Sequence, residues 1–123
     1  MKQSNKKTIG QEGEDLAAEY LVNNGFEMIT RNYRYGHGEI DIIAKDKSNG
    51  HLVFVEVKTR KNLEFGEPEN AITKSKIRQL KKIADAYIYE KDLNDVECRF
   101  DVMAIIWNKE TKPKITHFKN AFD

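Results

Sequence analysis

Apolar residues follow two different spacings along the chain, and glycine, proline or a short polar turn separates the segments. Between residues 8 and 24 the spacing is helical, acidic residues fill the first turn and Gly25 follows, so this stretch predicts an amphipathic helix. Residues 26–35 alternate apolar and polar side chains, which predicts a strand near one edge of a sheet. Two apolar runs within residues 39–60 flank Ser48-Asn49-Gly50 and predict a β-hairpin.

The second half of the chain predicts a loop, one helix and two strands. Residues 59–67 are polar, carry Gly66 before Pro68 and predict a mobile loop. Pro68 introduces a long helix at about residues 69–91, and strands are predicted at 96–107 and 114–118. The inward stripe of that helix is Ala71, Ile72, Ile77, Leu80, Ile83, Ala84, Tyr87 and Ile88. This order, αβββαββ, predicts an α/β fold with a mixed central sheet of about five strands flanked by helices.

Charged residues interrupt the apolar runs of the hairpin. Asp41 lies inside the first run, and Glu56 and Lys58 lie two residues apart in the second, on one face of the strand. A buried charge costs several kcal/mol unless it is paired or binds a metal. A structural ion pair with Lys58 is one explanation, but Glu39 adds a third acid to a single base. A divalent cation such as Mg²⁺, which prefers oxygen ligands, would balance this excess.

The alternation of the hairpin strands predicts which side chains lie together. The first strand is expected to place Glu39 and Asp41 on one face and Ile40 and Ile42 on the other. The second is expected to place Glu56 and Lys58 on the face of Leu52 and Phe54. If the register sets Asp41 beside Glu56, both carboxylates meet at the same end of the sheet, where one ion could touch them together.

Composition predicts the number of domains and the cellular compartment. The 123 residues are 33% charged and 39% hydrophobic with a net charge of +1, which is typical of a globular single domain. Cys98 is the single cysteine, so no internal disulfide forms and a reducing compartment is expected. The basic start is followed by no apolar stretch of signal-peptide or membrane-span length, so we expect a cytoplasmic protein that does not insert into a membrane.

Basic residues gather in the first half of the long predicted helix. Lys74, Lys76 and Arg78 lead this cluster, which has no acid until Asp85. It is either a solvated helix face or a nucleic-acid contact, because clustered cations release counterions from phosphates. Further candidate phosphate contacts are Arg34, with aromatic neighbours, and Arg60 and Lys61 in the loop after the hairpin.

The motifs resemble those of a known family. An acid in one strand followed by a strand ending in Glu-x-Lys resembles the PD-(D/E)xK nuclease superfamily, with Ile40 in place of the proline. The wider set resembles the small bacterial YraN-like family, related to Holliday-junction resolvases. Its motifs here are GQEGE at 10–14, NYR at 32–34, GEIDII at 38–43, FVEVKTR at 54–60 and FG at 65–66.

The resemblance implies a fold and a set of roles. It implies a single restriction-endonuclease-like domain over residues 1–123, with residues 1–8 as a flexible basic N-terminus. Asp41, Glu56 and the backbone carbonyl of Val57 would bind Mg²⁺, for which Mn²⁺ would substitute, and Lys58 would act on the attacking water. On the sequence alone Glu14 only complements the helix dipole. The resemblance makes it a further metal-site carboxylate.

These observations favour a metal-dependent endonuclease that hydrolyses phosphodiester bonds in DNA, branched DNA included. A homodimer would allow two strands to be cut symmetrically. The first alternative is a nucleic-acid-binding module without turnover. A second is a metal-free two-carboxylate enzyme of the glycosidase kind, which Lys58 disfavours if it keeps both acids ionised. Asp101, an acid in a later apolar strand, either pairs with the long helix or supports the site.

Overall fold

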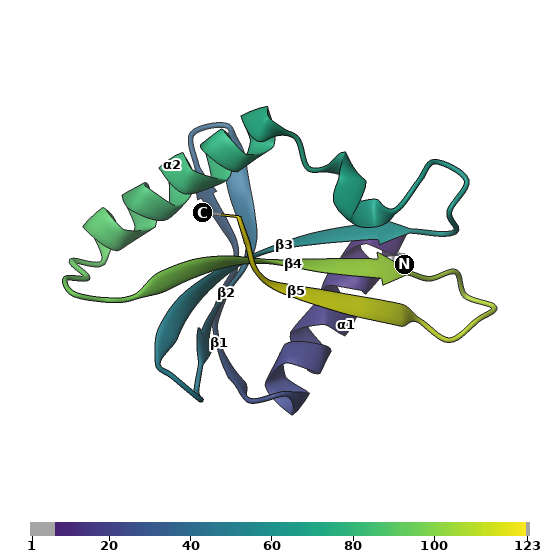
Figure 1. Cartoon of the computed structure of the whole chain (residues 1–123), viewed down its shortest axis with the longest axis horizontal. Coiled ribbons are helices and arrows are strands. Elements are labelled where there is room, and N and C mark those ends of the chain that lie inside the picture. Colours follow the sequence, from purple (N-terminus) through teal and green to yellow (C-terminus); the bar gives the residue numbers. More distant parts are fainter. Residues whose placement is uncertain (1–6, 123) are drawn as a thin grey trace, which may run out of the picture.

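The computed structural model describes residues 7–122, in which two helices and five strands follow one another in the predicted order, with a short 3-10 turn that was not predicted (Figure 1). Their bounds are α1 Ile9–Asn23, β1 Phe26–Tyr35, β2 Gly38–Asp46, β3 His51–Arg60, η1 Pro68–Ala71, α2 Lys74–Glu90, β4 Cys98–Ile106 and β5 Lys114–Phe122. The predicted α/β class and the order αβββαββ are confirmed. Residues 1–6 of the predicted flexible N-terminus lie outside the described part, whereas Thr8 caps α1.

The strands form one mixed sheet in the order β1-β2-β3-β4-β5. Three neighbouring pairs are antiparallel, and β3 and β4 run parallel because η1 and α2 connect them by a crossover. The two helices cover opposite faces of the sheet (Figure 1). Ala17 and Leu21 of α1 pack on one face, and Leu80 and Ile83 of α2 pack on the other. The central strands are therefore buried on both sides, as their long apolar runs indicate. No helix within residues 7–122 is long and apolar enough to cross a membrane.

The first helix is fixed at its N-terminus and pressed closely onto β3. Thr8 accepts a hydrogen bond from the Gln11 N–H, and the Gln11 side chain accepts one from the Thr8 N–H, which forms a capping box. One turn later Gly13 is buried against Thr59, and a Cβ at this position would overlap the threonine side chain. The glycine therefore lets the start of α1 approach the end of β3.

The long helix predicted at 69–91 is wrong at its start. Pro68–Ala71 form a separate 3-10 turn, Ile72 is extended, and α2 begins at Lys74. The physical reason is a new cap: the Thr73 side chain accepts a hydrogen bond from the Lys76 N–H at 3.1 Å. Ala71 and Ile72 therefore do not belong to the inward stripe of α2. At the other end of the chain, β5 extends to Phe122, four residues beyond the predicted strand.

Strict alternation fails in the middle of β2. Ile40 packs under α2 and Ile42 packs under α1, although residues two apart in a regular strand share a face. Across from Asp41, Asn32 of β1 has a positive φ of 55°, between the regular pairs of Arg31 with Ile42 and Tyr33 with Ile40. The predicted placement of Ile40 and Ile42 on one face is therefore wrong, because the alternation of β2 is interrupted between them, opposite the left-handed Asn32.

Candidate active site

A polar hollow of about 430 Å³ lies between the start of α1 and the first three strands. It is lined by Thr8, Gly10, Gln11, Glu14, Asn32, Arg34, Glu39, Asp41, Val57 and Thr59. The close packing of α1 on β3 brings Glu14 from the helix over the strands, and the local turn of β2 brings Asp41 to the same side. Three of the predicted metal ligands, Glu14, Asp41 and Val57, therefore line one cleft.

Three carboxylates converge in this cleft. Glu14, Glu39 and Asp41 each offer an oxygen, and these atoms lie within 4.8 Å of one another. All three side chains are only partly exposed. Such a set of oxygens fits a hard divalent cation, which takes several carboxylate, carbonyl and water ligands. Sequence reasoning counted Glu39 as surplus charge but gave it no role, although its two-residue spacing from Asp41 predicted that they lie together, which the cleft confirms.

Two side chains of β1 fix the orientation of these acids. The Asn32 amide donates hydrogen bonds of 3.1 Å to both Glu14 and Glu39. Arg31 donates to Glu14 at 2.9 Å and to Asp15 at 2.7 Å. The left-handed backbone of Asn32 lets its amide reach both carboxylates, and asparagine adopts this conformation more readily than most residues. Neither Asn32 nor Arg31 was assigned to the metal site from the sequence.

Asp41 is the electrostatic centre of the cleft. Burial, followed by the negative charge of Glu56, raises the pKa of Asp41 to about 7. The charges of Glu14 and Glu39 act in the same direction, and the Val57 N–H opposes them with a hydrogen bond of 2.8 Å to Asp41. An ionised Asp41 is therefore costly without a cation. Lys58, which was expected to keep both strand acids ionised, pairs with Glu56 and is not among the groups that shift the pKa of Asp41.

Glu56 is buried on the α2 side of the sheet. The hairpin pairs Ile42 with Val55, so Asp41 and Glu56 are the next residues of the two strands. Glu56 nevertheless stays outside the three-carboxylate group: its Oε2 lies 3.5 Å from Lys58 Nζ and 3.7 Å from Lys76 Nζ. Its side chain is 4% exposed, and its buried Oε1 has no hydrogen-bond partner among residues 7–122.

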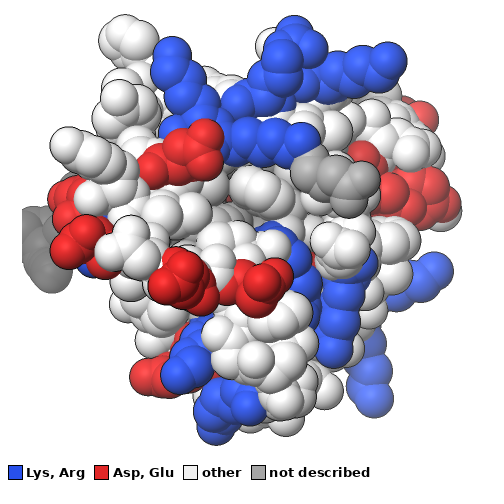
Figure 2. All heavy atoms as spheres, turned by 60° about the vertical axis from the view of Figure 1, so that its left-hand side comes forward, with Lys and Arg blue, Asp and Glu red and all other residues white. Residues whose placement is uncertain are grey.

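The predicted phosphate contacts differ in their surroundings. Arg34 lines the cleft, is 78% exposed and lies 3.3 Å from Glu39. On α2, Lys74 and Arg78 are exposed, whereas Lys76 is partly buried and paired with Glu56. Figure 2 shows Lys and Arg side chains gathered on the upper part of the molecule, where α2 lies. The predicted segregation of basic charge on this helix is therefore visible on the surface.

The two remaining basic residues lie where β3 ends: Arg60 is its last residue and Lys61 follows it. Lys61 is exposed beside a separate hollow that also contains Asn108 and Lys109. Arg60 is partly buried, its guanidinium donates to the Thr59 carbonyl at 3.4 Å, and its Nε is buried with no partner in the described part of the chain. The structure thus places both residues beyond the cleft lining, on the segment that leads into the loop at 61–67.

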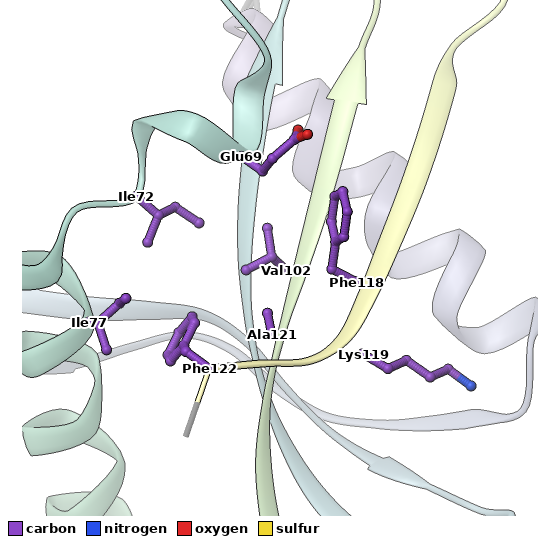
Figure 3. Close-up of a pocket in the computed structure, with 8 residues that line it drawn as sticks. All are labelled: Glu69, Ile72, Ile77, Val102, Phe118, Lys119, Ala121 and Phe122. Carbon is purple, nitrogen blue, oxygen red and sulfur yellow. The ribbon is translucent and has the colours of Figure 1, made fainter.

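A third hollow, of about 470 Å³, lies on the α2 side of the sheet (Figure 3). Ile72, which follows η1, points into it together with Val102 of β4 and Phe118 and Phe122 of β5, and Glu69 lies at one edge. Apolar walls with one carboxylate offer neither a group of metal ligands nor a nucleophile paired with a base. The candidate chemistry therefore belongs to the polar cleft.

Asp101 joins neither the long helix nor the candidate site. It is fully buried and accepts hydrogen bonds from Arg99 at 2.9 and 3.1 Å and from the Asn120 N–H at 2.9 Å. His117 Nε2 lies 2.7 Å from it. Although burial raises the pKa of Asp101, these partners hold it below its ordinary value. Both predicted roles are wrong: Asp101 ties β4 to β5 and, through Arg99, to Asp46 of β2.

Comparison with known sequences gives the family. The model of the Uncharacterised protein family UPF0102 matches residues 13–105. The chain belongs to this family. UPF0102 proteins of Trichlorobacter lovleyi and Geotalea daltonii are 44% and 46% identical to it over 117 and 120 residues, which cover 91% and 93% of those proteins and 95% and 98% of this chain. The YraN-like membership predicted from the motifs is thereby confirmed, and the family description assigns no activity.

Two solved structures resemble the fold. A repair endonuclease from Pyrococcus abyssi aligns with 89% of this chain at a TM-score of 0.48 and 19% identity. EndoMS in its complex with double-stranded DNA aligns with 81% of the chain at a TM-score of 0.46 and 22% identity. This chain spans 42% and 38% of those larger proteins.

Proposed function

We propose that this protein is a metal-dependent nuclease that hydrolyses phosphodiester bonds in DNA. The observation that carries the proposal is the convergence of Glu14, Glu39 and Asp41 in one polar cleft, with a raised pKa of about 7 at Asp41. Acids this close repel one another, and their excess of negative charge is stabilised most simply by a divalent cation. Metal-dependent phosphoryl chemistry uses such a site.

The residues fit Mg²⁺, and Mn²⁺ would substitute for it. Asp41 and Glu14 would hold the ion with Glu39 as a further ligand, and Glu56 and the Val57 carbonyl complete the predicted set. Bound there, the ion would lower the pKa of a water and neutralise charge on the phosphate. The unpartnered Oε1 of Glu56 supports a ligand role, because a buried carboxylate oxygen without a donor is costly.

The chain's own side chains have distinct tasks in this proposal. Lys58 would orient the attacking water and stabilise negative charge that develops on the phosphate. Asn32 keeps Glu14 and Glu39 at their positions, since its amide bonds to both. The Val57 N–H aims one oxygen of Asp41 toward β3 and leaves the other for the cleft. No histidine is needed as a base in this scheme.

The substrate is assigned from the distribution of positive charge. Arg34 lies at the cleft itself, and Lys74, Lys76 and Arg78 extend the positive surface along α2. Arg60 and Lys61 would follow the phosphate backbone away from β3. Branched DNA is the proposed preferred form, and symmetric cutting of two strands would require a homodimer.

Cleavage of labelled DNA tests the proposal. Four-way, flap, single-stranded and linear DNA are incubated with Mg²⁺, Mn²⁺ or EDTA and wild type, Glu56→Ala, Asp41→Ala or Glu27→Ala. Glu27 is exposed on β1 and serves as the matched control. We expect metal-dependent products with wild type and Glu27→Ala, and a loss of at least about 100-fold with the other two variants.

Two other outcomes would each support a different function. DNA binding by all variants without cutting in either metal would favour a binding module, which the pairing of Glu56 with two lysines also allows. Activity that persists in EDTA would favour metal-free carboxylate chemistry, for which Asp41 could supply the proton because its pKa is about 7.

A further inference from the structure

We propose that Lys76 couples DNA binding to assembly of the metal site. In the free protein Lys76 holds Glu56 in an ion pair, and a DNA phosphate that takes up Lys76 releases Glu56 to face the cation. This inference rests on the proposed function and adds a means of regulating the same site. The residues that carry it lie on two elements, α2 and β3, which the sequence separates by the loop and the 3-10 turn.

The geometry places Lys76 between solvent and the buried acid. Thr73 caps α2 through the Lys76 N–H, which fixes the first turn above the sheet. The Lys76 ammonium lies 3.7 Å from Glu56 Oε2, and its side chain is 30% exposed, compared with 4% for Glu56. A phosphate on the surface of α2 can therefore reach Lys76 but not the carboxylate behind it.

The ion pair contains one cation more than the acid requires. Lys58 already lies 3.5 Å from the same Oε2, and it is the residue of the nuclease-like motif. If Lys76 moves to a phosphate, Glu56 still keeps Lys58 and is not left as an isolated buried charge. Its other oxygen, Oε1, has no partner within residues 7–122 and is free to accept a new one.

Charge predicts the direction of the coupling. While Lys76 stays near Glu56, its ammonium repels a divalent cation and competes with it for the carboxylate. Lys74 and Arg78, exposed on the same half of α2, would draw a phosphate to the helix. Phosphate binding would neutralise Lys76 and tighten cation binding, and by linkage the cation would tighten DNA binding by the same factor.

The test compares Lys76→Gln with Lys74→Gln and Lys76→Arg. Binding of Mn²⁺ to each protein alone is measured from the EPR signal of the free ion. DNA affinity is then measured by fluorescence anisotropy with and without Mn²⁺, before any cleavage visible on a denaturing gel. Wild type should bind DNA at least about 5-fold more tightly with Mn²⁺, which is the lower end of common coupling factors.

The three variants should differ in Mn²⁺ binding and in the effect of Mn²⁺ on DNA affinity. Lys76→Gln should bind Mn²⁺ more tightly than wild type without DNA and should lose most of the Mn²⁺ effect on DNA affinity. Lys76→Arg should restore the effect of Mn²⁺ on DNA affinity. Lys74→Gln should weaken DNA binding but should retain this effect of Mn²⁺. Unfolding midpoints confirm that each variant is folded.

The coupling is refuted if Lys76→Gln binds Mn²⁺ no more tightly than wild type. It is also refuted if Lys74→Gln reduces the effect of Mn²⁺ on DNA affinity as much as Lys76→Gln does. The second result would mean that only the general charge of α2 matters. Because these measurements need no turnover, they are independent of the cleavage test. Failure of Mn²⁺ to bind wild type at all would instead refute the metal site of the proposed function.

Discussion

Replacing Asp41 by asparagine should stabilise the metal-free protein at neutral and alkaline pH while removing the proposed nuclease activity. Asparagine has the shape of aspartate, and its Oδ1 can still accept the hydrogen bond of the Val57 N–H. What it removes is the negative charge that the cleft disfavours through burial and through Glu56, Glu14 and Glu39. Functional sites commonly hold such destabilising groups.

The magnitude follows from the pKa. The pKa of Asp41 is raised from 3.8 to about 7 in the folded protein, which gives up to about 4 kcal/mol above pH 7 at about 1.4 kcal/mol per pH unit. We expect a measured gain of about 1–3 kcal/mol, because water in the cleft screens part of this cost. The folded state binds more protons than the unfolded state between about pH 4 and 7, so wild-type stability falls in this window as pH rises.

Urea unfolding in EDTA at several values between about pH 4.5 and 8.5 measures the effect. The gain of Asp41→Asn over wild type should grow as pH rises to about 7 and then stay level. Saturating Mg²⁺ at about pH 8 should stabilise wild type by about 2.7 kcal/mol when present at 100 times its dissociation constant, and should stabilise the variant much less.

Asp46→Asn is the matched control with the opposite sign. Although burial raises the pKa of Asp46, hydrogen bonds from Ser48 and the charge of Arg99 lower it to about 2. Its ionised form therefore stabilises the fold above about pH 4, and this stability is lost as pH falls toward 2. Asp46→Asn should cost about 2 kcal/mol at pH 7. Equal or lower stability of Asp41→Asn at pH 8 would refute the reasoning on Asp41.

Three further predictions concern the packing, the buried network and the DNA surface. Gly13→Ala should lower the free energy of unfolding by about 1–3 kcal/mol, because its Cβ overlaps Thr59, whereas Gly10→Ala, whose Cβ meets nothing nearer than 3.8 Å, should cost nothing in the same urea titration. Asp101→Asn should cost about 3 kcal/mol and leave Mn²⁺ affinity unchanged; altered affinity would place Asp101 at the site after all. Arg78→Gln should reduce the slope of log K against log salt for duplex DNA by about 0.9, and an unchanged slope would exclude Arg78 from the interface.

The sequence predicted the fold well because local patterns determine most of it. Helical spacing, strand alternation and the Ser-Asn-Gly turn predicted the element order and the hairpin, which are confirmed. The start of α2 was misplaced because Pro68 favours a helix start, while the cap at Thr73 competes with it and forms. The change of face at Asp41 lies opposite the positive φ of Asn32 in the neighbouring strand, and no local pattern of β2 encodes it.

The candidate site was predicted in part. Two acids two residues apart in β2 indicated the cleft correctly, because Glu39 and Asp41 both line it. The sequence could not show that Glu56 would face α2 and meet Lys76, since that contact depends on how the crossover returns the helix to the sheet. It also could not show that Asn32 bridges Glu14 and Glu39, which come from separate elements.

Asp41, which is partly buried, and Asp101, which is fully buried, are both acids in apolar strands, but their charged neighbours differ. Asp101 has Arg99 two residues away on its own strand and His117 on the next, so its charge is neutralised and its pKa lowered. Asp41 has Glu39 two residues away and Glu56 across the register, so its charge is reinforced and its pKa raised. A fold gains nothing from the second arrangement unless a cation completes it. The sign of the neighbouring charge, rather than burial itself, therefore separates the structural acid from the candidate ligand.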